Sequence, residues 1–490
     1  MKQLYRNIGF TGVSQFVYTL MAFILVPFIA RYLKSDGYGL YNLATILGFF
    51  FGLLSDLGVT TLLTVEVAKN KLYVGKLLAT AMGLKLLLIG PAAAVIFFYL
   101  RISRIDAAGS AAVMIFTVSS LFASFSGSFF SIFRGCQRME FETIVTILDK
   151  FLSVALGIFF LVRGYGIHVF LMSFVIAEAA KFVLSVFILQ KNFTPIRAQF
   201  SLHRFRPLFV KSIPFGLSVF LAVCYNYTAI LMLTSFTGMT EVGLYSASFK
   251  FLTLTTIIPT VLATAFLPQL SELRYSRAEL TDLFIEGVRY LFFFSIPMVP
   301  FVAFNAKAFI GLVFGSDFNG SVLLLQVLVW AAFAQMTNIF FVSLYTALGR
   351  QKIIVYFQLI GLGLNLPLNL ILIRSHASLG AAFATVATEW SILLMVAGFA
   401  GKTLLDRRRL AAPLVRYVAK TLTAASAMSV AGVLLRHWTG NAAVSIAGTV
   451  FVYLLVAQAN GAMALGRLLQ VVTLSAGRKL GNHGKTTAGN

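Results

Sequence analysis

Charged side chains lie inside long apolar stretches of this sequence, at positions that a membrane would penalise. Lys85 and Lys250 each interrupt such a stretch. A charge at mid-bilayer costs several kcal/mol unless it faces water, a partner or an ion path. Lys250 shares a helical face with Ser246 and Thr253 and has no acidic residue near it in the sequence. We predict that Lys250 lines a cationic cavity; the alternative is that its amine extends along the helix to the membrane surface. Lys85 is a second candidate cavity cation, for which both interpretations stay open.

A second group of charges in the apolar stretches can neutralise itself locally. Lys181 follows Glu178 by three residues, a spacing that favours an ion pair on one helix face, and Asp149 directly precedes Lys150. We predict a structural ion pair between Glu178 and Lys181. Lys181 is also kept as a candidate cavity cation, and Glu178 as a candidate titratable group.

Three further carboxylates are candidates for coupling transport to an ion. Asp56 and Glu66 flank one end of the second apolar run. Burial could let Asp56 titrate, whereas Glu66 has Lys69 as a local partner or caps a helix. Glu389 has no basic residue within one helical turn, and it is the strongest candidate for ion coupling in the second half of the chain.

Uncharged polar residues also interrupt the apolar runs. Tyr225 and Asn226 lie together in one run, and Asn365 and Asn369 share a helical face around Pro367. Tyrosine and asparagine suit sugar hydroxyls through stacking and hydrogen bonds. They suit hydrogen bonding between helices equally well, so both interpretations of these four residues stay open.

Signatures of an enzyme are missing from the sequence. The five histidines are scattered, and the two cysteines have no metal-binding spacing. Gly484-Lys485-Thr486 resembles the end of a P-loop, but Lys479 stands where that motif needs its first glycine. We therefore expect no catalytic site, no metal and no cofactor.

The composition explains why charges are so informative here. Of the 490 residues 59% are hydrophobic and 11% are charged, and mean hydropathy is +0.90, whereas soluble proteins keep roughly a quarter of their residues charged. Runs of about twenty apolar residues can each cross a bilayer. The sequence predicts 14 such spans: 8–30, 40–63, 77–100, 110–133, 143–162, 167–189, 210–235, 243–268, 288–313, 321–347, 353–373, 379–401, 414–434 and 443–466.

The basic residues predict the orientation in the membrane. With the N-terminus inside, 27 of the 39 Lys and Arg residues fall on the cytoplasmic side and 8 on the other side. This bias is typical of a positive-inside topology with both termini in the cytoplasm. Because the charges are spread over loops between spans, the net charge of +23 indicates contact with membrane lipids and no nucleic-acid partner.

The second half of the chain repeats the first. Gly12 corresponds to Gly216, and Gly39-Leu40-Tyr41 to Gly243-Leu244-Tyr245. An even number of spans separates the copies, so the repeats have the same orientation in the membrane. The stretch from Ile24 to Ala68 shows the repeated unit: an apolar helix, a predicted turn at Ser-Asp-Gly-Tyr-Gly and a second apolar helix.

The sequence therefore predicts an all-α polytopic membrane protein with two parallel six-helix repeats and two additional C-terminal helices. We expect an N-terminal lobe over 1–200, a C-terminal lobe over 201–402, the two additional helices over 403–470 and a basic, disordered cytoplasmic tail over 471–490.

The stretch VPFIARYLKSDGYGLYNLA, followed by LLSDLG and VEVAKN, resembles the opening of the polysaccharide-exporter (O-antigen flippase) branch of the MOP flippase superfamily. EVGLYSASFKF and the NLPLNLILI region resemble its second half. The resemblance implies two six-helix lobes arranged as a V around a central cavity. It also implies a flippase of the cytoplasmic (inner) membrane that moves polyprenyl-pyrophosphate-linked oligosaccharides across it by alternating access.

In that family flipping is thought to be coupled to an ion, for which the four carboxylates above would serve. Glycosyltransferases or a polysaccharide polymerase are implied as partners. One departure concerns the seventh span, where many relatives carry an aspartate and this chain reads Tyr225-Asn226-Tyr227-Thr228. Any role of that aspartate cannot be transferred to this chain.

Three other functions fit a chain of this kind. A multidrug antiporter of the same superfamily would favour an anionic cavity, against which the lysines argue. A membrane-embedded polysaccharide polymerase or ligase would need a large outer loop, whereas the predicted outer loops are short. A scaffold for glycan assembly is compatible with the sequence.

Overall fold

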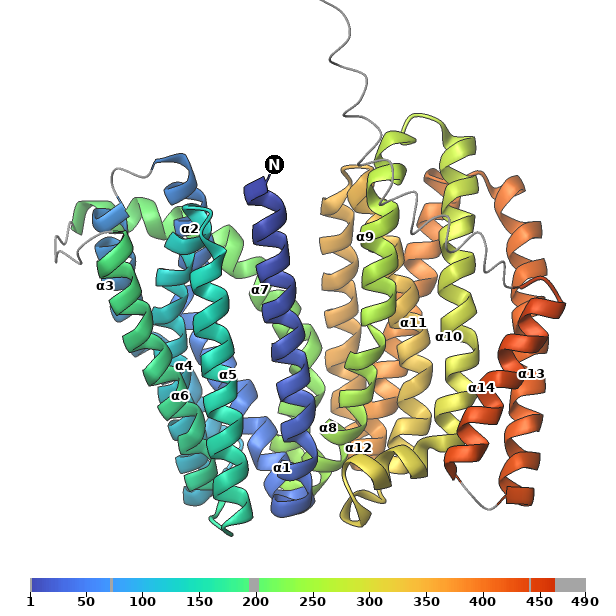
Figure 1. Cartoon of the computed structure of the whole chain (residues 1–490), viewed down its shortest axis with the longest axis horizontal. Coiled ribbons are helices and arrows are strands. Elements are labelled where there is room, and N and C mark those ends of the chain that lie inside the picture. Colours follow the sequence, from blue (N-terminus) through green and yellow to red (C-terminus); the bar gives the residue numbers. More distant parts are fainter. Residues whose placement is uncertain (1, 71–73, 194–201, 440–441, 463–490) are drawn as a thin grey trace, which may run out of the picture. The chain divides into compact units, whose positions relative to one another are not determined.

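The computed structural model describes residues 2–70, 74–193, 202–439 and 442–462, and the regular elements of these residues are all helices (Figure 1). The predicted tail over 471–490 and the predicted lobe boundary at residue 200 lie outside the described residues. The helices are α1 (Lys2–Asp56), α2 (Val59–Lys69), α3 (Val74–Ile102), α4 (Ala107–Gly135), α5 (Met139–Val162), α6 (Ile167–Asn192), α7 (Leu202–Phe236), α8 (Met239–Thr255), α9 (Ile257–Glu272), α10 (Arg277–Val313), the short 3₁₀ helix η2 (Ser316–Phe318), α11 (Ser321–Ala347), α12 (Gln351–Thr403), α13 (Arg407–Thr439) and α14 (Ala442–Ala459).

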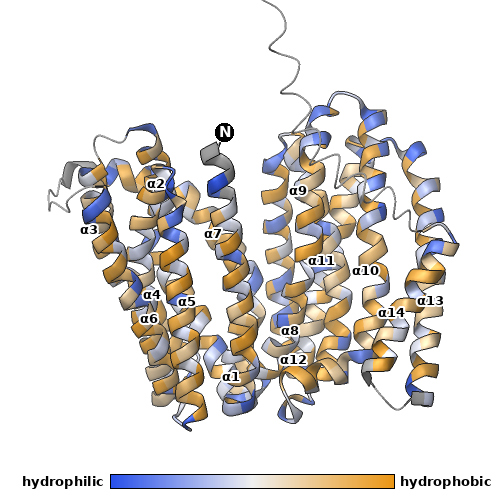
Figure 2. Cartoon of the chain, in the orientation of Figure 1, coloured by the Kyte–Doolittle hydropathy of each residue, from blue (hydrophilic) through white to orange (hydrophobic). Residues whose placement is uncertain are grey.

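Eleven helical segments of the described part are long and apolar enough to cross a membrane when α8 and α9 are counted together, and α14 adds a shorter apolar helix. Figure 2 shows hydrophobic residues along the helices and hydrophilic ones gathered toward their ends. Large apolar side chains such as Leu87 (61% exposed) and Phe98 (62% exposed) face outward, as lipid contact requires. The prediction of an all-helical, multi-span membrane protein is confirmed.

Two of the eleven long helices each contain two predicted spans. α1 leaves helical geometry at Lys34 (φ 56°, ψ −173°), and α12 does so at Ala377 (φ 47°, ψ −128°). The predicted turn at Ser35–Gly39 is therefore misplaced, because those five residues already belong to the second half of α1. Ser35 and Asp36 suit the first turn of a helix.

The second predicted span of each repeat is broken into two helices. In the first repeat α1 ends at Asp56 and α2 begins at Val59, and the positive φ angles of Leu57 (41°) and Gly58 (81°) separate them. In the second repeat α8 ends at Thr255 and α9 begins at Ile257. A break in a membrane helix exposes backbone groups that need polar partners, and such partners lie at the first break.

The contacts divide the chain into two compact units, of which the first contains Met1–Ala247, Ile310–Gly320 and Leu366–Ala381. In this unit α4 and α5 both pack against α1 and α6, while α7 packs against α1, α2 and α3. Its core contains fully buried Leu63, Phe129, Phe133 and Leu189 from α2, α4 and α6. Burying such side chains stabilises each by about 1.5–3 kcal/mol.

The second unit contains Ser248–Phe309, Ser321–Asn365 and Ala382–Asn490. Here α9 packs against α11, and α13 packs against α14. The Tyr453 hydroxyl of α14 donates to the Phe293 carbonyl of α10, and the Tyr417 hydroxyl of α13 donates to the Ala462 carbonyl at 2.8 Å. The two additional helices are thus joined to α10 by a buried aromatic cluster.

Candidate functional site

The break between α1 and α2 positions the Asp56 carboxylate. Asp56 ends α1, and its oxygens accept hydrogen bonds from the backbone N–H groups of Gly58 (3.2 Å) and Thr60 (3.1 Å) and from the Thr60 hydroxyl. A carboxylate at this place satisfies the unpaired N–H groups of α2 and opposes the positive end of its dipole. Asp56 therefore serves first as the cap of a helix inside the bundle.

Lys85 of α3 is the charge partner of Asp56. Its ammonium lies 2.8 Å from Asp56 Oδ1 and 3.0 Å from Thr60 Oγ1, and it also donates to the Ser124 carbonyl of α4. These three acceptors match the three N–H donors of an ammonium. Because Lys85 is only 1% exposed, it is held inside the first unit in this conformation and does not face open space.

A second charge cluster joins α5 to α6. Lys150 Nζ lies 3.1 Å from Asp149, while Lys181 Nζ lies 3.8 Å from Asp149 and also pairs with Glu178. The predicted structural ion pair between Glu178 and Lys181 is present in this larger cluster of two cations and two anions. Glu66 and Lys69 form a separate, partly exposed pair at 3.1 Å, as the sequence spacing suggested.

The second unit holds the most buried of the four candidate carboxylates. Glu389 of α12 is 5% exposed. Asn338 Nδ2 of α11 donates to Glu389 Oε2 at 3.0 Å and to its main-chain carbonyl at 3.2 Å. Asn338 is itself 8% exposed, and its Oδ1 is buried without a hydrogen-bond partner.

The residues predicted to contact sugar hydroxyls are buried on α12 and more accessible on α7. Asn365 Nδ2 donates to Thr388 Oγ1 at 3.1 Å, which links the two halves of α12 inside the second unit. Asn369 is fully buried in the first unit. Asn226, beside Tyr225 on α7, is exposed and donates to the Ala222 carbonyl one turn back. Asn226 is thus the most accessible of these amides.

Lys250 differs from the other intramembrane lysines. It is exposed on α8, and no carboxylate of the described residues lies within salt-bridge distance of its amine. Lys85 and Lys181 are each held by carboxylates. Lys250 is therefore the candidate cation whose charge is available to a ligand.

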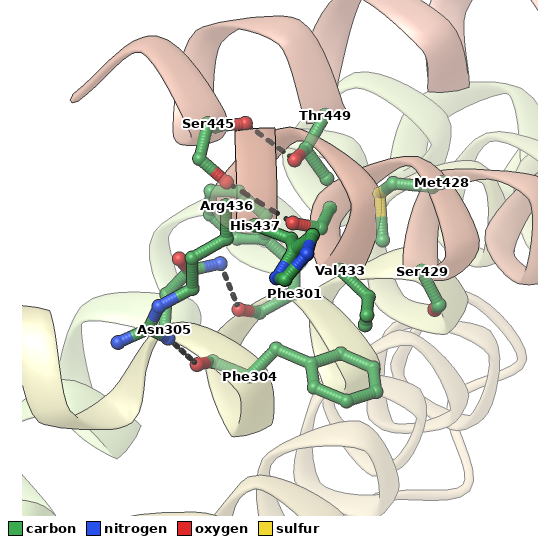
Figure 3. A pocket seen from close by; sticks show the side chains of 11 residues that line it. Phe301, Phe304, Asn305, Met428, Ser429, Val433, Arg436, His437, Ser445 and Thr449 are labelled. Atoms are coloured by element: carbon green, nitrogen blue, oxygen red, sulfur yellow. Dashed lines mark hydrogen bonds between the residues drawn. The ribbon is translucent and has the colours of Figure 1, made fainter. Parts of the chain in front are cut away.

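A cavity of about 420 Å³ lies between α10, α13 and α14 of the second unit (Figure 3). Phe301, Met428 and Val433 contribute apolar surface, and Arg436 and His437 contribute basic groups. Sequence reasoning did not identify this cavity. In the described part of the chain no group of three or more His, Cys, Asp or Glu side chains could hold a metal ion.

Sequence reasoning also missed the partners of the charged residues. Asn338 follows Thr337 in an otherwise apolar helix, and this polar pair was the available signal. No signal in the sequence indicated the roles of Thr60 and Ser124, because small hydroxyl residues are common in membrane helices. Their roles follow from contacts between helices that are distant in the sequence.

The polysaccharide biosynthesis protein family model matches residues 4–274, more than half of the chain. The chain belongs to this family. The resemblance read from the sequence is thereby confirmed at the level of the family. No curated protein matches the sequence.

Solved structures give the fold of this family member. The lipid II flippase MurJ in an inward closed conformation matches with a TM-score of 0.68 and 15% identity, over 92% of this chain and 98% of that one. An inward-facing multidrug resistance MATE family transporter of the MOP superfamily matches with a TM-score of 0.61 and 15% identity, over 83% of this chain and 98% of that one.

A third match is a MOP superfamily transporter from Pyrococcus furiosus Vc1, described as having a binding pocket of reverse polarity. Its TM-score is 0.52 at 15% identity, over 84% of this chain and 95% of that one. At these identities the likeness establishes the fold alone. The family member is a multi-pass membrane protein with the fold of the MOP transporters.

Proposed function

We propose that this protein is a flippase that moves polyprenyl-pyrophosphate-linked oligosaccharides across the cytoplasmic membrane for the synthesis of a surface polysaccharide. The observation that carries the proposal is that a member of the polysaccharide biosynthesis family shares, over 92% of its length, the fold of a lipid II flippase. That neighbour is a lipid II flippase, and the class of substrate is transferred from it to this chain as a proposal.

The share of the chain that is matched supports the same choice. The unmatched 8% corresponds to about 39 residues, fewer than lie between Arg407 and Ala459. The likeness to the lipid II flippase therefore includes at least part of the stretch that forms α13 and α14. The multidrug transporter covers a smaller share of the chain, 83%.

The charges of the described residues favour an anionic substrate. A pyrophosphate must cross a region of low dielectric constant, where an accessible cation stabilises it. We propose Lys250 as the first such cation. Separately, we propose Tyr225 and Asn226 of the first unit as contacts for sugar hydroxyls. Lys85, Lys181, Asn365 and Asn369 are candidates that would contribute in other conformations of the transport cycle.

We further propose Glu389 as the carboxylate that couples transport to an ion. It is buried, and its carboxylate accepts a hydrogen bond from the Asn338 amide. Asp56 and Glu178 each have a lysine within 4.0 Å, and Glu66 is partly exposed beside Lys69. Of the four candidate carboxylates, Glu389 is the one most shielded from solvent in this conformation.

The remaining parts of the proposal concern topology and partners. We propose two six-helix lobes over 1–200 and 201–402, and cytoplasmic N- and C-termini. Glycosyltransferases and a polysaccharide polymerase are the proposed partners, and these would supply and consume the lipid-linked glycan.

Depletion of the protein in its native host tests the function directly. Polyprenyl-linked glycans would be extracted from spheroplasts after treatment from outside with periodate or a lectin. A flippase predicts that complete repeat units accumulate in the protected inner leaflet. Accumulation of single units in the accessible outer leaflet would contradict this and would favour a polymerase or ligase. Unchanged glycans with increased drug sensitivity would favour the multidrug antiporter.

A further inference from the structure

The cavity between α10, α13 and α14 lies at one end of the second unit's helices. α13 begins with the basic run Arg407–Arg409, and the cavity is lined by its last turns, from Met428 to His437. The cavity is thus at the end of α13 opposite this basic run. With the positive-inside topology, that end faces the outer leaflet.

Two glycines allow the helices to form this cavity. A Cβ atom on Gly432 of α13 would lie 3.2 Å from Thr449 Oγ1, and one on Gly448 of α14 would lie 2.5 Å from Leu435 Cδ1. Small residues let membrane helices approach closely. The close crossing holds the end of α13 against α14, and both help to line the cavity beside α10.

The buried hydroxyls of the cavity are already used by the protein. Ser445 Oγ donates to the Gly432 carbonyl at 3.2 Å, and Thr449 Oγ1 donates to the Ser445 carbonyl (Figure 3). Asn305 Nδ2 likewise donates to the Phe301 carbonyl at 2.9 Å. These bonds build the wall of the cavity and leave recognition to the basic groups.

Arg436 supplies the charge that the cavity offers, and His437 adds a second polar side chain. Both are exposed, and Figure 3 shows their side chains beside the cavity with Asn305 and Phe304. Arg436 donates to the Phe304 carbonyl across a long 3.4 Å contact. A guanidinium has five N–H donors, so Arg436 is anchored by one of them and keeps others for a ligand. None of the described residues forms a salt bridge with Arg436 or His437.

We propose that this cavity binds the phosphate group of a membrane lipid in the leaflet at this end of the helices. A guanidinium recognises phosphate through paired hydrogen bonds. The apolar side chains of Phe301, Met428 and Val433 suit the first carbons of the lipid chain. The ligand class is a lipid phosphate, carried either by a common anionic phospholipid or by a polyprenyl carrier. This site does not depend on the proposed transport function.

Lipid binding to the purified full-length protein tests the site. Delipidated protein in detergent would be titrated with phosphatidylglycerol, with polyprenyl monophosphate and with uncharged diacylglycerol, and the bound lipid measured by native mass spectrometry. We expect saturable binding of at least one phosphate lipid and none of diacylglycerol. Binding of polyprenyl phosphate alone would support the carrier as the source, and binding of both would support a general lipid-phosphate site.

Four variants distinguish specific binding of the lipid phosphate in the cavity from non-specific attraction of lipid to a positive charge. Arg436→Ala should weaken lipid binding about tenfold or more, as expected for the loss of charged hydrogen bonds. Arg436→Lys should also weaken lipid binding, because an ammonium cannot form the paired hydrogen bonds that a guanidinium forms with a phosphate. Val433→Trp should block the cavity while the arginine remains. Arg163→Ala, which removes another exposed helix-end arginine that stacks on Phe159, is the matched control.

Size-exclusion profiles and thermal unfolding would verify that each variant is folded. Equal lipid binding by Arg436→Ala and Arg163→Ala would overturn the proposal. Full binding by Val433→Trp or by Arg436→Lys would also overturn it, because binding would then need only a positive charge near the membrane surface.

Discussion

Gly39 and Gly243 hold the same position in the two sequence repeats and contact each other in the first unit. A Cβ atom on Gly39 would lie 2.0 Å from the Met239 carbonyl oxygen, and one on Gly243 would lie 1.9 Å from the Ser35 carbonyl oxygen. Ser35 and Met239 are also equivalent in the repeat. The contact is therefore reciprocal, and it brings the backbones of α1 and α8 together where a side chain cannot fit.

Replacing Gly243 with alanine should loosen this contact. The added methyl group would meet backbone atoms that cannot rotate away, and overpacking of this kind costs on the order of 1–3 kcal/mol. We expect a lower midpoint of thermal unfolding in detergent. Gly238→Ala is the control, because a Cβ atom there meets nothing within 4 Å. Equal unfolding midpoints for Gly243→Ala and Gly238→Ala would contradict the prediction, because they would show that α1 and α8 can move apart without loss of stability.

Lys85→Met should destabilise the first unit more than the double variant Asp56→Asn/Lys85→Met. The single change leaves the Asp56 charge without its ammonium, and breaking a buried ion pair costs about 3–5 kcal/mol. The double change removes both charges, and the asparagine introduced in place of Asp56 can still accept the hydrogen bonds from α2. Thermal unfolding of the wild type, both single variants and the double variant would measure the coupling. Additive effects would contradict a direct interaction.

Glu389→Gln should keep the fold and remove coupling. Glutamine can still accept the hydrogen bond from Asn338 Nδ2, but it cannot gain or lose a proton. Glycan flipping in proteoliposomes should then no longer respond to an imposed pH gradient. Glu66→Gln, in the partly exposed pair with Lys69, is the control and should keep the response. An unchanged response in Glu389→Gln would remove Glu389 from the coupling step.

Lys250→Ala should abolish export, or reduce it at least tenfold, while membrane insertion stays normal. The amine of Lys250 has no salt-bridge partner among the described residues, so its loss should leave the structure unaffected and remove a positive charge available to pyrophosphate. Lys250→Arg should retain part of the activity. Lys307→Ala, at another exposed lysine, serves as the control in the same export assay. Wild-type export by Lys250→Ala would indicate a lysine that only extends to the membrane surface.

The membrane spans could be predicted from the sequence because hydropathy depends on each residue and its near neighbours. The apolar runs from residue 77 to 100 and from 110 to 133 correspond closely to α3 and α4. The repeat, too, is a property of the order of residues. Local ion pairs such as Glu66–Lys69 and Glu178–Lys181 were predictable because three residues span one helical turn.

Contacts between distant helices could not be predicted in the same way. Lys85 is paired with Asp56, 29 positions earlier, and Asn338 with Glu389, 51 positions later. A helical pattern identifies the residues that share a face but not the helix that this face meets.

The positions of the breaks depended on the tertiary structure for the same reason. Gly37 and Gly39 suggested a turn, yet the chain turns at Lys34, and the lack of a side chain at Gly39 serves its contact with Gly243. The sequence by itself determined the membrane environment, the all-helical class and the family. Only the tertiary structure decided which charges neutralise one another and which remain available, because that depends on distances between atoms far apart in the chain.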